Sequence, residues 1–157
     1  MLRAITKWIL AWLVAAILTA FLGSVFSSLR VIALLNNIGG NSGSGQTLSM
    51  VFYDALHFGT LYFIFVAIGF FIAFLAGSAL LWITKLRSQN IYRLIVFGVA
   101  AAVSMSVMLW AMKNVFFGTQ IVAGARDGTG FILQILAGIL GGLVFALLTR
   151  PKPPEFN

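Results

Sequence analysis

The sequence contains no cysteine, and this absence excludes several kinds of chemistry. Disulfide bonds, thiol redox reactions, thiolate metal sites and covalently attached c-type haem all need cysteine. Charge is also scarce, because charged residues make up 8% of the chain, against about 25% in a typical soluble domain. A chain with so little charge cannot cover its apolar surface in water. We therefore expect a polytopic membrane protein.

Hydrophobic residues make up 61% of the 157 residues, which leaves no room for a separate soluble domain beside one compact bundle. The net charge is +7, but the basic residues are scattered between apolar segments. Such scattering is typical of topology signals and of contact with anionic lipid, and it argues against nucleic-acid binding. The expected partner is the lipid bilayer.

Four long apolar segments predict an all-α, four-helix transmembrane bundle over residues 1–149. We expect the spans at about residues 8–29, 58–83, 94–112 and 129–149. The first apolar run is longer than the hydrophobic region of a signal peptide, which favours a retained helix over a cleaved leader. The Pro-rich residues 150–157 predict a disordered cytoplasmic tail.

The connectors between these spans differ in character. Residues 36–47 form an uncharged Gly/Ser/Asn loop. The apolar residues that follow it allow two interpretations: the second helix projects beyond the membrane, or residues 48–56 form a short amphipathic piece in the interface. Residues 115–125 are too apolar for an ordinary loop and predict an interfacial or re-entrant segment. Asp127 is expected to cap the fourth helix.

The basic residues also predict an orientation. Seven Lys and Arg residues fall at the amino end, in the 84–93 connector and in the tail, whereas three fall on the opposite side. Because basic residues are enriched in cytoplasmic loops, both termini are expected to be cytoplasmic.

Small residues recur at four-residue spacing in the spans, which places each set on one helix face. The sets are Gly69, Ala73 and Gly77; Gly98 and Ala102; and Gly138 and Gly142. Such faces let helix backbones approach closely. One interpretation is packing within the bundle. The other is that at least one face serves a homo-oligomer or a larger membrane complex.

Most of the chain's charged side chains on the non-cytoplasmic side form a predicted outer polar cluster: Arg30, Asp54, His57, Lys113, Arg126 and Asp127. Asp54 and His57 are three residues apart and would share a helix face. Arg30 ends the preceding helix at a similar depth and would be able to pair with Asp54. The cluster is either a pH-responsive or ligand-binding site, or a set of snorkelling helix ends with an incidental ion pair.

Catalytic, cofactor and metal sites are not expected. A zinc enzyme needs three protein ligands, and the candidates are Asp54, His57 and Asp127. The single histidine excludes bis-histidine haem and has no serine-hydrolase motif around it. The spans themselves carry no charge, which argues against a secondary transporter with a site at the midplane.

These observations favour a small integral protein of the bacterial inner (cell) membrane that acts by helix–helix assembly. It would be an accessory subunit or interaction partner in a membrane complex. The alternative is a homo-oligomeric channel or permeation pathway for small solutes, in which Arg30, Lys113 and Arg126 would favour anions at the outer mouth.

Overall fold

A computed structural model describes residues 2–37, 44–86, 89–115 and 122–150. Side chains are defined throughout these ranges except at residues 2–4, 35, 44–61, 115 and 123. Over the described residues the chain is all-α and contains no strand. The predicted fold class is confirmed to this extent: four helices are long and apolar enough to cross a membrane.

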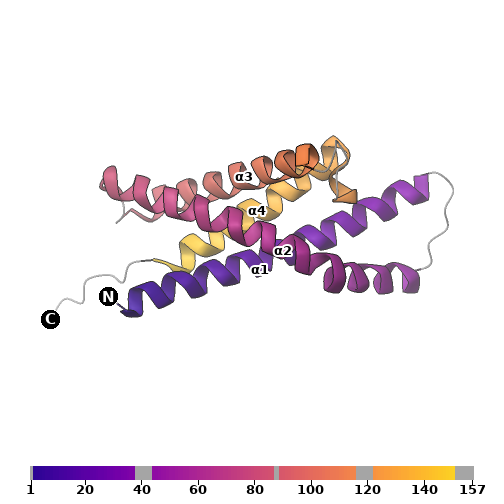
Figure 1. The fold of residues 1–157 in the computed structure, drawn as a ribbon, viewed down its shortest axis with the longest axis horizontal. Coiled ribbons are helices and arrows are strands. Elements are labelled where there is room, and N and C mark those ends of the chain that lie inside the picture. The colour runs from indigo at the N-terminus through magenta and orange to yellow at the C-terminus, as the bar shows by residue number, and fades with distance from the viewer. Residues whose placement is uncertain (1, 38–43, 87–88, 116–121, 151–157) are drawn as a thin grey trace.

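The four helices are α1 (Leu2–Asn37), α2 (Ser44–Ile83), α3 (Asn90–Val115) and α4 (Gly128–Leu148). A short 3-10 turn, η2 (Ala123–Ala125), precedes α4. Figure 1 shows the helices running roughly along one axis, with the start of α1 and the end of α4 at the same end of the bundle. We call this end, where α2 also passes to α3, the basic end, and the end that carries η2 the outer end.

The helices differ in length, and the difference shapes the molecule. α2 has 40 residues and α1 has 36, which correspond to about 60 and 54 Å. α4 has 21 residues, or about 32 Å, close to the hydrocarbon thickness of about 30 Å. The last turns of α1 and the first turns of α2 consequently extend past α3 and α4 at the outer end (Figure 1). We call this part the projecting hairpin.

α2 runs without a break from Ser44. It therefore begins within residues 36–47, which were expected to form a loop. Of the two interpretations of residues 48–56, the structure therefore shows the continuous helix. The predicted cap of α4 is confirmed: Asp127 has extended backbone angles, and its side chain accepts a hydrogen bond from the backbone N–H of Gly130. Residues 116–121, which include much of the predicted re-entrant segment, lie outside the described residues.

The core near the basic end is built from aromatic rings. Phe74 stacks on Phe145 with ring centroids 4.1 Å apart, and Phe97 meets the edge of Phe145 at 4.8 Å. Phe70 lies 4.9 Å from Phe74. All four rings are almost fully buried, so α2, α3 and α4 meet here without an open passage between them. We call these four residues the aromatic cluster.

Candidate functional site

Arg30 and Asp127 form an ion pair at the outer end. The Nε of Arg30 donates to Oδ2 of Asp127 at 2.9 Å, and Nη2 donates to the same oxygen. Asp127 therefore holds two helices at once, because it also caps α4 through Gly130. The hydrogen bond from Arg30 is the main cause that lowers the pKa of Asp127 below its usual range, and the bond from Gly130 adds to it.

Of the other members of the predicted outer polar cluster, the structure describes the side chains of Lys113 and Arg126. Lys113 and Arg126 are exposed to the surroundings of the bundle. Asp54 and His57 belong to α2, and their side chains lie outside the described residues. The partner that the structure gives to Arg30 is Asp127, and the predicted pairing with Asp54 falls on a side chain outside the described residues. The sequence alone does not identify which carboxylate pairs with Arg30, because Asp54 and Asp127 are expected at the same depth.

A second polar feature lies deep between the helices and was not predicted. The hydroxyl of Tyr62 on α2 donates to Oε1 of Gln134 on α4 at 2.6 Å. The amide nitrogen of Gln134 donates in turn to the backbone oxygen of Gly23 on α1 at 2.8 Å. Gln134 and Tyr62 are almost completely buried, so this chain of hydrogen bonds connects three helices inside the apolar part of the bundle. We call it the tyrosine–glutamine clasp.

The clasp depends on a glycine at position 23. A Cβ atom there would lie 2.6 Å from the Gln134 oxygen and 2.8 Å from the Tyr62 ring. Farther along α1, Ser27 accepts a hydrogen bond from the backbone N–H of Gly124 in η2 at 3.0 Å. The face of α1 that meets η2 and α4 is therefore lined with small and polar residues, which bring the backbones close together.

Sequence reasoning missed the clasp because its members carry no charge. Gln134 is noticeable as an amide within an apolar span, but nothing in its neighbours identifies Tyr62 or the Gly23 carbonyl as partners. The signal that was available is the rarity of an amide in such a segment, since a buried amide must find donors and acceptors within the protein.

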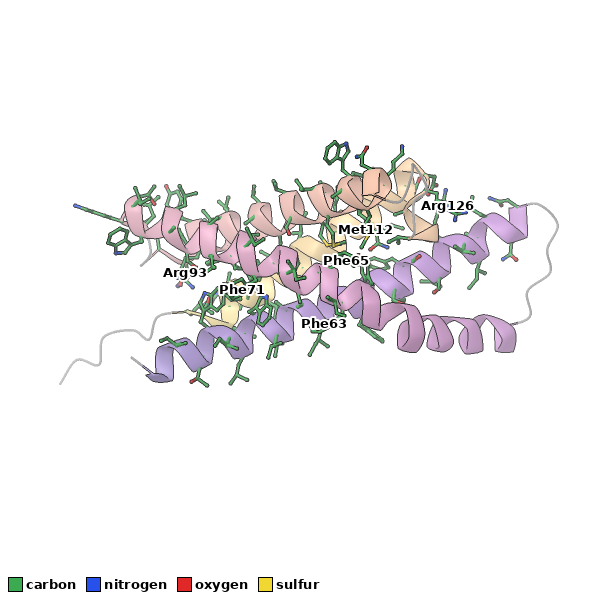
Figure 2. The ribbon with its side chains drawn as sticks, viewed as in Figure 1. Phe63, Phe65, Phe71, Arg93, Met112 and Arg126 are labelled. Carbon is green, nitrogen blue, oxygen red and sulfur yellow. The ribbon has the colours of Figure 1, made fainter. Side chains whose placement is uncertain are left out.

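Two cations bind the carbonyl end of α4 at the basic end. Nη2 of Arg93 donates to the backbone oxygen of Thr149 at 2.9 Å and to its hydroxyl at 2.8 Å. The guanidinium also lies over the ring of Phe97, 5.5 Å from its centroid. Lys7 donates to the backbone oxygen of Arg150 at 3.3 Å. Cations are favourable here because the carbonyl end of a helix is partially negative. Figure 2 shows Arg93 and Arg126 at opposite ends of the bundle.

The small residues predicted to pack helices fall into two places. Gly138 and Gly142 on α4 are buried against α3, and a Cβ on Gly142 would lie 2.3 Å from the backbone oxygen of Phe97. Gly98 on α3 makes ordinary contact with Leu143, and Ala102 is half-buried. The third set, Gly69, Ala73 and Gly77, lines a groove on the surface between α2 and α3.

This lateral groove has a volume of about 950 Å³ and runs between Phe65 and Leu80 along α2. Its lining is apolar apart from the hydroxyl of Ser104, which lies beside Gly69. Branched side chains such as Val99 and Val103 form its α3 wall. The groove suits a flexible apolar chain or an apolar helix face, and it holds no group for acid–base chemistry.

Among the residues that the structure describes, no three His, Asp or Glu side chains come close enough together to hold a metal ion.

Comparison with known proteins does not assign the chain to a family. No protein-family model matches it, and neither the curated proteins nor the solved structures contain a significant match. The fold and the site geometry therefore carry the functional argument. The four apolar helices indicate a multi-pass membrane protein.

Proposed function

We propose that the chain is a multi-pass protein of a bacterial inner membrane, with both termini cytoplasmic, that acts by helix–helix assembly. It serves as an accessory subunit or interaction partner in a membrane complex. The observation that carries this proposal is the projecting hairpin. It gives the protein helical surface beyond the length that membrane crossing requires.

Helix lengths show how much helix exceeds the membrane-crossing length. The projecting hairpin is part of this excess: Arg30 pairs with Asp127 at the start of α4, so α1 extends seven residues, or about 10 Å, past that level. α1 and α2 exceed a hydrocarbon core of about 30 Å by about 24 and 30 Å. α3, with 26 residues, exceeds it by only about 9 Å. Two long helices that extend past α3 and α4 at one end offer helical surface to a neighbouring subunit.

The interior of the bundle supports an assembly role over conduction. The aromatic cluster fills the space between α2, α3 and α4, and the clasp joins α1, α2 and α4 at another level. The guanidinium of Arg30 is paired with Asp127, so it is not available for a ring of positive charge at an outer mouth. A channel would then need a polar path between copies of the chain.

The mass of the protein extracted from its native membrane in mild detergent tests this proposal. We expect a particle heavier than one chain. Replacing residues 36–53 by a short Gly/Ser linker shortens the projecting hairpin and leaves the four spans in place. This variant should run as a single chain, whereas a control lacking residues 151–157 should keep the mass of the wild type.

Two results would contradict the proposal. One is a wild-type particle with the mass of a single chain. The other is a closed homo-oligomer that conducts anions when reconstituted in liposomes, which would establish the channel alternative in its place.

A further inference from the structure

The lateral groove between α2 and α3 is a feature that the proposed assembly role leaves unused. It lies on the side of the bundle, apart from the projecting hairpin. Its floor is made of small residues such as Gly69 and Ala73, so the helix backbones themselves come near the surface. An unfilled groove of this kind loses packing contacts along its whole lining. Some apolar group must therefore occupy it.

The dimensions of the groove match a hydrocarbon chain. Between Phe65 and Leu80 α2 rises by about 22 Å, which exceeds the depth of about 15 Å that one leaflet contributes to a hydrocarbon core of about 30 Å. A complete acyl chain consequently fits within the groove. Ser104 offers the one hydroxyl among its lining residues, so most of the contact is between hydrocarbon surfaces.

One exposed cation follows the end of the groove on α2. α2 continues for one turn past Leu80, where Thr84 donates its backbone N–H to the Leu80 oxygen at 3.0 Å, and Lys85 follows directly. Lys85 is exposed. Arg93 on α3 does not contribute charge here, because it is buried and donates to Thr149 at the end of α4. The one acidic side chain that the structure describes, Asp127, lies at the opposite end of the bundle.

The backbone at Lys85 supports a role for its charge. Its φ angle is +57°, in the left-handed region that glycine or asparagine usually occupies at the end of a helix. A lysine adopts this conformation at a cost in conformational energy. The chain thus has a lysine where glycine would stabilise the same turn, at the mouth of an apolar groove.

We propose that the groove between α2 and α3 binds one anionic phospholipid, with an acyl chain between the helices and the phosphate beside Lys85. The acyl chain of the lipid supplies packing contacts. These contacts are similar for any phospholipid, because all lipid tails are as apolar as the groove. The headgroup supplies selectivity, because a basic residue near the membrane surface attracts anionic lipid. A transmembrane helix would fit the same groove, but an apolar helix leaves the charge of Lys85 without a complement.

Native mass spectrometry of the full chain in mild detergent tests this site. Phosphatidylglycerol and phosphatidylcholine with identical acyl chains are titrated separately. We expect one phosphatidylglycerol per chain, bound about fivefold more tightly than phosphatidylcholine, which is the factor that one basic residue contributes at an anionic surface.

Substitutions distinguish the contribution of the lipid headgroup from that of the acyl chain. Lys85→Gly suits the left-handed backbone and removes the charge, so the protein should fold normally and bind both lipids equally, while Lys85→Arg should keep the preference. Ala76→Phe places a ring in the groove and should weaken both lipids by more than about tenfold. Ala79→Phe is the matched control, because Ala79 is equally exposed on α2 but does not line the groove.

Each of four results would overturn the proposal. The first is equal binding of the two lipids by the wild type. The second is an unchanged preference in Lys85→Gly. The third is the same effect of Ala76→Phe and Ala79→Phe when both variants keep the helical content of the wild type. The fourth is a wild-type dimer that dissociates in the Ala76→Phe variant, since the groove would then be a contact between two copies of the protein.

Discussion

Polar side chains inside an apolar bundle must find their partners within the protein. Gln134 has both donor and acceptor capacity, and the structure uses each once, toward Gly23 and from Tyr62. Because hydrocarbon offers no water to replace these bonds, the clasp fixes the relative positions of α1, α2 and α4 more specifically than apolar packing does.

Removing the Tyr62 hydroxyl tests the clasp at the scale of one atom. We expect Tyr62→Phe to lower the free energy of unfolding by about 1 kcal/mol, since hydrogen bonds between helices in membranes contribute about 0.6 to 2 kcal/mol. The ring remains, so no cavity forms. The loss of stability arises because Oε1 of Gln134 no longer accepts the hydrogen bond from the Tyr62 hydroxyl. Unfolding in mixed micelles with increasing SDS measures the difference.

Tyr92→Phe provides the control for this substitution. Tyr92 is exposed, so loss of its hydroxyl should leave the unfolding curve unchanged. If the two tyrosine substitutions changed the free energy of unfolding equally, the buried hydrogen bond between Tyr62 and Gln134 would make no specific contribution to stability.

At the scale of the helices, α3 and α4 approach each other through glycine. A Cβ atom on Gly142 would lie 2.3 Å from the backbone oxygen of Phe97 and 2.8 Å from the Cβ of Ala101. The first neighbour is backbone, which cannot move aside without moving the helix. Gly138 differs, because its nearest neighbour is the flexible side chain of Met105 at 2.4 Å.

Gly142→Ala should therefore destabilise the bundle by about 1–3 kcal/mol, the usual cost of overpacking. The matched substitution Gly98→Ala concerns the same pair of helices but places its methyl 3.7 Å from Leu143, an ordinary contact. We expect it to be neutral or slightly stabilising, because alanine favours helix more than glycine does. Both are measured by unfolding in SDS. Similar losses in the two variants would contradict close backbone approach at Gly142.

The helices and the cap were predictable because they depend on local sequence. Long uncharged runs must form helices in hydrocarbon, and an aspartate before Gly128 is a typical N-cap. The pairing of Arg30 with Asp127 was not predictable, since Asp54 and Asp127 are expected at similar depth and only the arrangement of the helices brings Asp127 to Arg30. The continuous helix was one of two interpretations, but its start at Ser44 was not predictable, because low charge and a Gly/Ser loop leave the helix start undefined.

The lateral groove could not be read from the sequence for a related reason. Gly69, Ala73 and Gly77 share a face in any helix, and the same spacing occurs at Gly138 and Gly142. One set is buried against a neighbouring helix, and the other lines an open groove. The spacing determines which residues share a face, whereas the placement of the third helix determines whether that face is covered.

At the scale of the whole molecule, charge is distributed unevenly between the two ends. The basic end carries four cations with described side chains, Lys7, Lys85, Arg93 and Arg150. At the outer end Arg30 is paired with Asp127, and the other cations with described side chains are Lys113 and Arg126. Because α1 begins and α4 ends at the basic end, one orientation rule covers both termini (Figure 1).

The absence of cysteine makes this orientation directly measurable, because a single introduced cysteine is the one thiol in the chain. Asn37 ends α1 at the outer end, and Gln89 precedes α3 at the basic end; both are exposed. We expect a membrane-impermeant maleimide to label Asn37→Cys in intact cells, and Gln89→Cys only after the membrane is permeabilised. The excess of cations at the basic end is the physical reason for this expectation, since basic residues are enriched on the cytoplasmic side of membrane proteins. Labelling of Gln89→Cys in intact cells would contradict this prediction and show the opposite orientation. It would also place Lys85 and the mouth of the groove in the other leaflet, so the same experiment determines from which side an anionic lipid would reach it.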